Sequence, residues 1–203
     1  MSAAASFSLG CLSFVDRLVP DAQRATPRER HAVRCLVLLG ALSALSAPPL
    51  TLMYHLLGYD AAGMVVLTGG VAMMVAPFSL GAGVGLAAAR DLFIGALFLL
   101  KIWLALHLGG LSAPTLSWFA LCPMIAMLIG GTRPALIWAG LVALAMLALF
   151  WLGRGGGLTA HPVADQPVLE LVSILGLVAL ATVIVLCLRL APGPGRVRGE
   201  RRH

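Results

Sequence analysis

The chain has 203 residues, of which 60% are hydrophobic and 11% are charged, and it carries a formal net charge of +6. Soluble domains contain about 25% charged residues, so this chain has too little polar surface to cover a water-exposed globule. Its basic residues gather at the two ends, which indicates membrane topology and argues against nucleic-acid binding. We predict an all-α polytopic membrane protein with six transmembrane helices, the lipid bilayer as its main partner and no nucleic-acid partner.

Residues 1–32 are expected to form a cytoplasmic segment ahead of the first span. Two interpretations of its beginning stay open: residues 7–19 form a short interfacial helix, or they belong to a disordered tail that touches lipid. Thr26 and Glu29 have the spacing of a capping box, which predicts that a helix begins at this point. The first span then covers about 33–57.

The second span is predicted over 62–80. The spacing of Gly81 and Gly85 would let another backbone approach closely, although glycine is common throughout this chain. Arg90-Asp91 is expected to mark a short turn, and the third span to run over 91–108.

The most informative segment is 109–138, an apolar run held between two Gly-Gly pairs. Each pair is followed within four residues by a proline, and a tryptophan follows each proline. These residues are Gly109, Gly110, Pro114 and Trp118, and then Gly130, Gly131, Pro134 and Trp138. Such a pattern stops and turns a membrane helix twice, with aromatic residues at the water boundary. It predicts a short fourth span over 113–129, interrupted by Pro123, and a fifth over 134–152.

The sixth span is predicted over 167–190, and 191–203 as a basic cytoplasmic tail that is disordered. With the N-terminus inside, twelve arginines fall in cytoplasmic segments, among them Arg133 in the turn before the fifth span. Arg154 lies in an outer loop and Lys101 within a span, which together account for the 14 basic residues. This asymmetry predicts that both termini are cytoplasmic.

Lys101 is the ionisable residue placed deepest in a predicted span. Such residues mark functional sites in many membrane proteins, but a lysine this close to a helix end can also snorkel to the interface. Both interpretations of Lys101 stay open. We find no nucleophile paired with a base, no carboxylate pair and no HxxxH or CxxC spacing, so we expect no catalytic residues, no metal site and no cofactor.

The outer end of the fourth span is the best candidate for a binding site. Ser112 can cap its helix, and helix N-termini favour anions and other hydrogen-bond acceptors. A shallow pocket there would be ringed by Lys101, His107, Ser112, Thr115 and Ser117. The competing interpretation is a plain hairpin with polar caps.

The chain resembles the six-helix membrane-embedded sensor region at the N-terminus of many bacterial histidine kinases and diguanylate cyclases. The turn positions that carry the resemblance are Gly109, Gly110, Ser112, Pro114, Trp118, Pro123, Gly131, Arg133 and Trp138. Its opening (Phe14, Arg17, Leu18, Pro20) and the end of its first span (Leu57, Gly58) are also similar. The resemblance covers about 14–190. It departs at residues 79–91, where a polar turn is expected. It also implies a coiled coil and a kinase or cyclase domain after the sixth span, which residues 191–203 do not supply.

The resemblance implies a non-catalytic sensory module of a two-component or cyclic-di-GMP signalling system. It also implies that the protein lies in a bacterial inner (plasma) membrane, that it forms a homodimer, and that a separate kinase or cyclase is its output partner. Two other functions are weighed against it. A small permease would need a polar path through the bundle, and an intramembrane enzyme would need a nucleophile paired with a base, which the sequence does not show.

Overall fold

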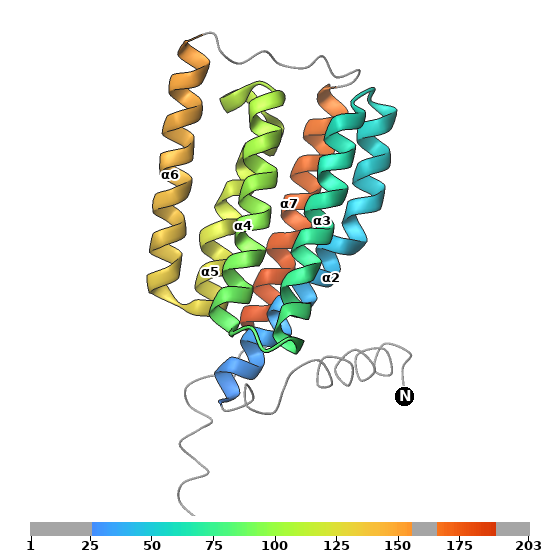
Figure 1. The fold of residues 1–203 in the computed structure, drawn as a ribbon. Coiled ribbons are helices and arrows are strands. Elements are labelled where there is room, and N and C mark those ends of the chain that lie inside the picture. The colour runs from blue at the N-terminus through green and yellow to red at the C-terminus, as the bar shows by residue number, and fades with distance from the viewer. Residues whose placement is uncertain (1–25, 156–165, 190–203) are drawn as a thin grey trace, which may run out of the picture.

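The computed structural model describes residues 26–155 and 166–189, and every regular element in these ranges is helical (Figure 1). Residues 1–25 of the predicted N-terminal segment, the whole of the predicted C-terminal tail, and residues 156–165 between the fifth and sixth predicted spans lie outside the described residues. The α-helices are α2 (Pro27–Leu56), α3 (Asp60–Gly81), α4 (Leu86–His107), α5 (Leu121–Gly130), α6 (Thr132–Arg154) and α7 (Gln166–Arg189). The all-α class predicted from the sequence is therefore confirmed for this part of the chain.

Helix α2 begins where the capping box predicts. The Glu29 backbone N–H donates to Thr26 Oγ1 at 3.2 Å, and the Thr26 N–H donates to Glu29 Oε2 at 3.1 Å. These two bonds satisfy donors that the first helical turn would otherwise leave free. The helix continues through Pro48 and Pro49 to Leu56.

Small residues bring α2 and α3 into close contact. A Cβ added to Gly70 would lie 2.5 Å from Ala47 Cβ, and one added to Gly40 would lie 2.9 Å from Pro77 Cγ. Gly81 and Gly85 do not form the predicted packing motif, because α3 ends at Gly81 and a Cβ on Gly85 would meet no atom within 4 Å.

Helix α4 begins at Leu86, so Arg90 and Asp91 lie in its first turns and do not form the predicted turn. Arg90 donates from Nε and Nη2 to the Asp91 carboxylate, both at 2.9 Å. Trp138 Nε1 on α6 donates to the same carboxylate at 3.2 Å. The early start therefore places Asp91 where it can connect α4 to α6.

The predicted fourth span is a composite element. It consists of the 3₁₀ helices η2 (Gly110–Ser112) and η3 (Pro114–Ala120), followed by α5. Ala113, and not Ser112, is the N-cap residue of η3. Gly109 and Gly131, at the two ends of this element, have φ of 101° and 85°, which a side chain at either position would strain.

Three of the described helices are long and apolar enough to cross a membrane: α2 from Arg28, α3 and α6. Helix α4 has 22 residues but carries Arg90, Asp91 and Lys101. Figure 1 shows α6 at one edge of the bundle, where it packs against α5, while α7 contacts α5 and η3. Leu149 is the one residue of α6 that is fully buried, so this helix presents an apolar surface to its surroundings.

Candidate functional site

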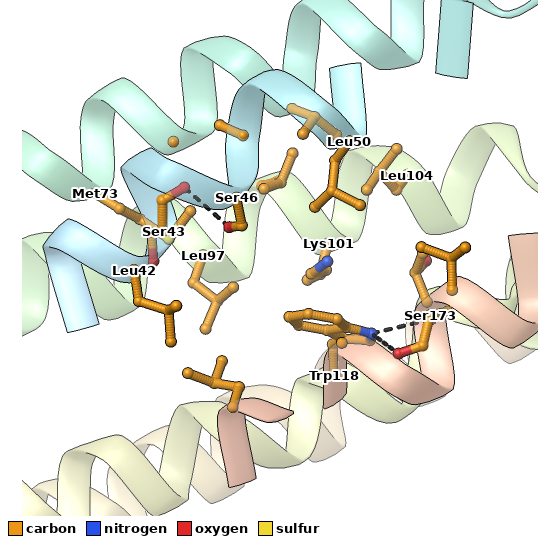
Figure 2. Close-up of a pocket in the computed structure, with 18 of the residues that line it drawn as sticks. Leu42, Ser43, Ser46, Leu50, Met73, Leu97, Lys101, Leu104, Trp118 and Ser173 are labelled. Carbon is orange, nitrogen blue, oxygen red and sulfur yellow. Dashed lines mark hydrogen bonds between the residues drawn. The ribbon is translucent and has the colours of Figure 1, made fainter. Parts of the chain in front are cut away.

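A cavity of about 580 Å³ lies between α2, α3, α4, α5, α7 and η3 (Figure 2). Its walls are mainly aliphatic and include Leu42, Leu50, Met73, Leu97 and Leu104. The volume falls within the range of about 300–1,000 Å³ that is usual for small-molecule sites. The bundle therefore holds a largely apolar chamber of the size that a small molecule occupies.

Lys101 on α4 brings the one charged side chain among the described residues that line this cavity. The residue is 7% exposed, and its Nζ lies 4.0 Å from the centroid of the Trp118 ring. Figure 2 shows the ammonium above the indole in the middle of the chamber. Of the two interpretations of Lys101 that the sequence leaves open, the structure therefore favours the one in which its side chain lines a cavity.

Two hydrogen bonds hold the Trp118 ring in place. Its Nε1–H lies 3.0 Å from Ser173 Oγ and 3.2 Å from the Ser173 carbonyl oxygen. Ser173 Oγ in turn donates to the Pro114 carbonyl at 2.9 Å. The indole is thereby fixed between η3 and α7, and we call the contact between Trp118 and Ser173 the η3–α7 latch.

Thr115 is a second polar group at the cavity. The residue is 4% exposed, and its Oγ1 is the one buried side-chain nitrogen or oxygen without a hydrogen-bond partner in the described part of the chain. Residues three apart lie on the same face of a 3₁₀ helix, so Thr115 and Trp118 share one face of η3. A buried hydroxyl without a partner costs free energy, and a bound acceptor would remove that cost.

The two serine hydroxyls that α2 contributes to the wall are already bonded to backbone carbonyls. Ser43 Oγ donates to Leu39 O at 2.8 Å, and Ser46 Oγ donates to Ser43 O at 3.1 Å. Both bonds lie within α2 and are the usual way in which a helical serine satisfies its hydroxyl. Lys101, Thr115 and Tyr54 of α2 are therefore the polar side chains of the wall that make no hydrogen bond within the described residues.

The structure brings together two of the five predicted ligand-binding residues. Lys101 and Thr115 line the cavity, whereas Ser117 is exposed and lies outside it. His107 stacks on Trp103 with ring centroids 4.0 Å apart, and its Nδ1 lies 2.9 Å from Trp103 O, away from the cavity. The side chain of Ser112 lies outside the described residues.

From the sequence, Trp118 is expected only at a turn, and Ser173 is not among the predicted site residues. Trp118 lines the cavity and supplies the face on which Lys101 rests. Ser173 is a single hydroxyl in an apolar stretch of α7, which is a weak signal for a site. The residues that neighbour Trp118 and Ser173 in the sequence do not indicate that these two side chains are in contact.

The structure shows where the other predicted turn residues lie and what contacts they make. Gly109, Gly110 and Gly131 adopt positive φ, Pro114 accepts the bond from Ser173, and Trp138 donates to Asp91. Pro123 lies in the first turn of α5, and Arg133 lies in the first turn of α6. The described residues include no group of three His, Cys, Asp or Glu side chains that could hold a metal ion.

No family model, no curated protein and no solved structure matches the chain. The resemblance to bacterial sensor regions therefore remains a prediction from the residues quoted above.

Proposed function

We propose that the chain is a membrane-embedded receptor module that binds a lipophilic molecule in the central cavity and reports its presence through α7. The module crosses the inner membrane six times, has both termini in the cytoplasm and performs no chemistry itself. Its output passes to a separate kinase or cyclase, as the resemblance to bacterial sensor regions suggests.

The positions of the arginines support this orientation. A Cβ on Gly131, at the turn between α5 and α6, would lie 3.0 Å from Arg28 Nη2, and one on Gly130 would contact Arg90. The start of α2, the start of α4 and the turn between α5 and α6 therefore share one end of the bundle (Figure 1). Arg154 lies at the other end of α6. Basic residues concentrated at one end mark that end as cytoplasmic.

The η3–α7 latch is the observation that carries the receptor function. Trp118 forms part of the cavity wall and also bonds to α7 through Ser173. A molecule that enters the cavity would contact the Trp118 indole, which is hydrogen-bonded to α7. Ligand binding can shift a conformational equilibrium only if the two states differ in affinity for the ligand, and this shared ring supplies such a difference.

Distance measurement between α4 and α7 tests the proposal. Spin labels at Leu92→Cys and Val185→Cys would occupy exposed positions on these two helices, with Cys11 and Cys187 replaced by serine. Decanol and decanoate, added to the protein in phosphatidylcholine nanodiscs, are the probes. We expect at least one of them to change the distance by about 1–2 Å, the size of typical helix shifts.

A matched variant separates signalling from binding. Ser173→Ala removes the hydroxyl of the latch and should reduce the distance change while a probe still binds. If neither probe changes the distance in the unmodified chain at saturating binding, the receptor function is wrong. Faster uptake of a probe into sealed proteoliposomes than into protein-free liposomes would favour the permease instead.

A further inference from the structure

The charge in the cavity has no acidic partner among the described residues. These ranges contain four carboxylates, Glu29, Asp60, Asp91 and Glu170. Glu29 caps α2, Asp60 pairs with His55, and Asp91 pairs with Arg90. Glu170 is exposed and does not line the cavity. The Lys101 ammonium therefore has the face of Trp118 as its partner in the described part of the chain.

A cation over an aromatic face keeps its capacity to donate hydrogen bonds. The indole ring attracts the positive charge through its quadrupole, but it provides no lone pair that could accept a hydrogen bond from the ammonium. A lysine ammonium has three N–H donors, and Lys101 lies in a largely apolar chamber. Charges in such a medium are costly unless they are paired and hydrogen-bonded, so the site is complementary to an anion.

Thr115 supplies an independent indication of a ligand. Its Oγ1 is buried and has no partner, and it shares a face of η3 with Trp118, on which Lys101 rests. An anion on the Lys101 ammonium that also reaches this hydroxyl would satisfy both groups. Hydrogen bonds to charged groups are about twice as strong as those between neutral groups.

The number of charges limits the chemistry of the anion. The single Lys101 cation, with the Thr115 hydroxyl beside it, matches a carboxylate, which carries a single negative charge on two acceptor oxygens. A phosphate monoester carries between one and two negative charges at neutral pH, and its second charge would lack a counter-ion in the cavity. The rest of the wall is aliphatic, which suits a hydrocarbon tail.

From these groups we infer that the ligand is a lipophilic monocarboxylate, with its carboxylate on Lys101 and Thr115 and its hydrocarbon chain along the leucines of α2 and α4. The inference rests on the proposed receptor function and specifies the class of its ligand. It makes Lys101 the residue that selects for charge and Thr115 the residue that adds a second hydrogen bond.

Calorimetric titration of the full chain in phosphatidylcholine nanodiscs tests this inference. The probes are decanoate, decanol and decyl phosphate, and titrations of empty nanodiscs correct for partitioning into lipid. We expect decanoate to bind at least about tenfold more tightly than either of the others, because a hydrogen-bonded charge pair contributes that much.

Three variants locate the effect. Lys101→Met keeps the length of the side chain without its charge and should weaken decanoate binding about 10- to 100-fold while decanol binding stays within about threefold. Thr115→Val removes the hydroxyl at nearly constant shape and should weaken decanoate binding about 3- to 10-fold. Ser117→Ala, an exposed position on the same 3₁₀ helix, is the matched control and should change nothing.

Several outcomes would overturn the inference. Equal affinity for decanoate and decanol, tighter binding of decyl phosphate, or full decanoate affinity in folded Lys101→Met would each do so. An absence of decanoate binding to the folded natural chain would also overturn it. If decanol alone binds and moves α7, the receptor function stands and the ligand class is wrong. If decanoate binds through Lys101 and α7 does not move, the ligand class stands and the receptor function is wrong.

Discussion

Trp118 Nε1 and Ser173 Oγ lie 3.0 Å apart although the residues are separated by 55 positions in the sequence. The bond joins the 3₁₀ helix η3 to the first half of α7, and it closes one side of the cavity. Ser173 also bonds to Pro114, so one hydroxyl links α7 to the start of η3 and to its aromatic residue. We expect this pair to couple cavity occupancy to α7.

A double-mutant cycle measures that coupling. Trp118→Phe keeps an aromatic ring under Lys101 but removes the indole donor, and Ser173→Ala removes the acceptor hydroxyl. Each change should lower the free energy of unfolding in mixed micelles by about 1 kcal/mol, the net contribution of a typical hydrogen bond. The two effects should be non-additive by about 0.5 kcal/mol or more. Strict additivity would show that the two side chains do not interact.

Lys101→Met should raise the free energy of unfolding of the ligand-free protein by about 1 kcal/mol. Effective desolvation of a buried ammonium costs several kcal/mol, and a desolvated cation–π contact returns only about 2 kcal/mol. The same variant is expected to lose decanoate affinity, so stability and binding would change in opposite directions. Unfolding in mixed micelles measures this free energy. A decrease of more than about 1 kcal/mol would instead show that Lys101 stabilises the fold.

Gly70→Ala should destabilise the protein by about 1–3 kcal/mol, the usual cost of overpacking. The added methyl group would lie 2.5 Å from Ala47 Cβ and so would force α2 and α3 apart. Gly140→Ala is the matched control, since a Cβ at this exposed position on α6 meets no atom within 4 Å. It should be neutral or slightly stabilising because alanine favours helix. Equal effects of the two substitutions would contradict the close α2–α3 contact.

The proposed orientation predicts which side of the membrane each turn faces. Leu111→Cys, in the exposed turn before η3, should react with a membrane-impermeant maleimide added to right-side-out vesicles. Thr132→Cys, at the start of α6, should react only in inverted vesicles. Reaction of both cysteines from the same side would contradict the hairpin formed by η3 and α5, and the opposite pattern would place the termini outside.

The sequence predicts the helices well where the physical signals are local. The capping box at Thr26 and Glu29 gives the start of α2, and the Gly-Gly pairs give the two turns around α5, because caps and positive φ depend on neighbouring residues. The sequence misplaces the start of α4 by five residues. Arg90 and Asp91 look like a solvent-exposed turn, but in the fold they pair with each other and with Trp138.

The candidate site is only partly predictable from the sequence, because several of its contacts join residues that are far apart in the chain. Lys101 stands out because charge is rare in an apolar helix. Its partner Trp118 resembles an ordinary interfacial aromatic residue, and Ser173 resembles an ordinary helical hydroxyl. Their roles depend on contacts between η3 and α7 that are set by tertiary packing. His107 was expected at the site because it lies near the end of a span, but it stacks on Trp103 four residues away in its own helix.

The most direct test of the account uses the fact that Lys101 is the one lysine in the sequence. Protein labelled with ¹⁵N at lysine Nζ and decanoate labelled with ¹³C at the carboxyl carbon would give a single ¹³C–¹⁵N pair in solid-state dipolar recoupling. We expect a coupling that corresponds to a separation of about 4 Å or less between the two labelled atoms, the range of an ion pair. The coupling should disappear when unlabelled decanoate is added in excess. A bound carboxylate signal without measurable coupling to the Lys101 nitrogen would contradict the site.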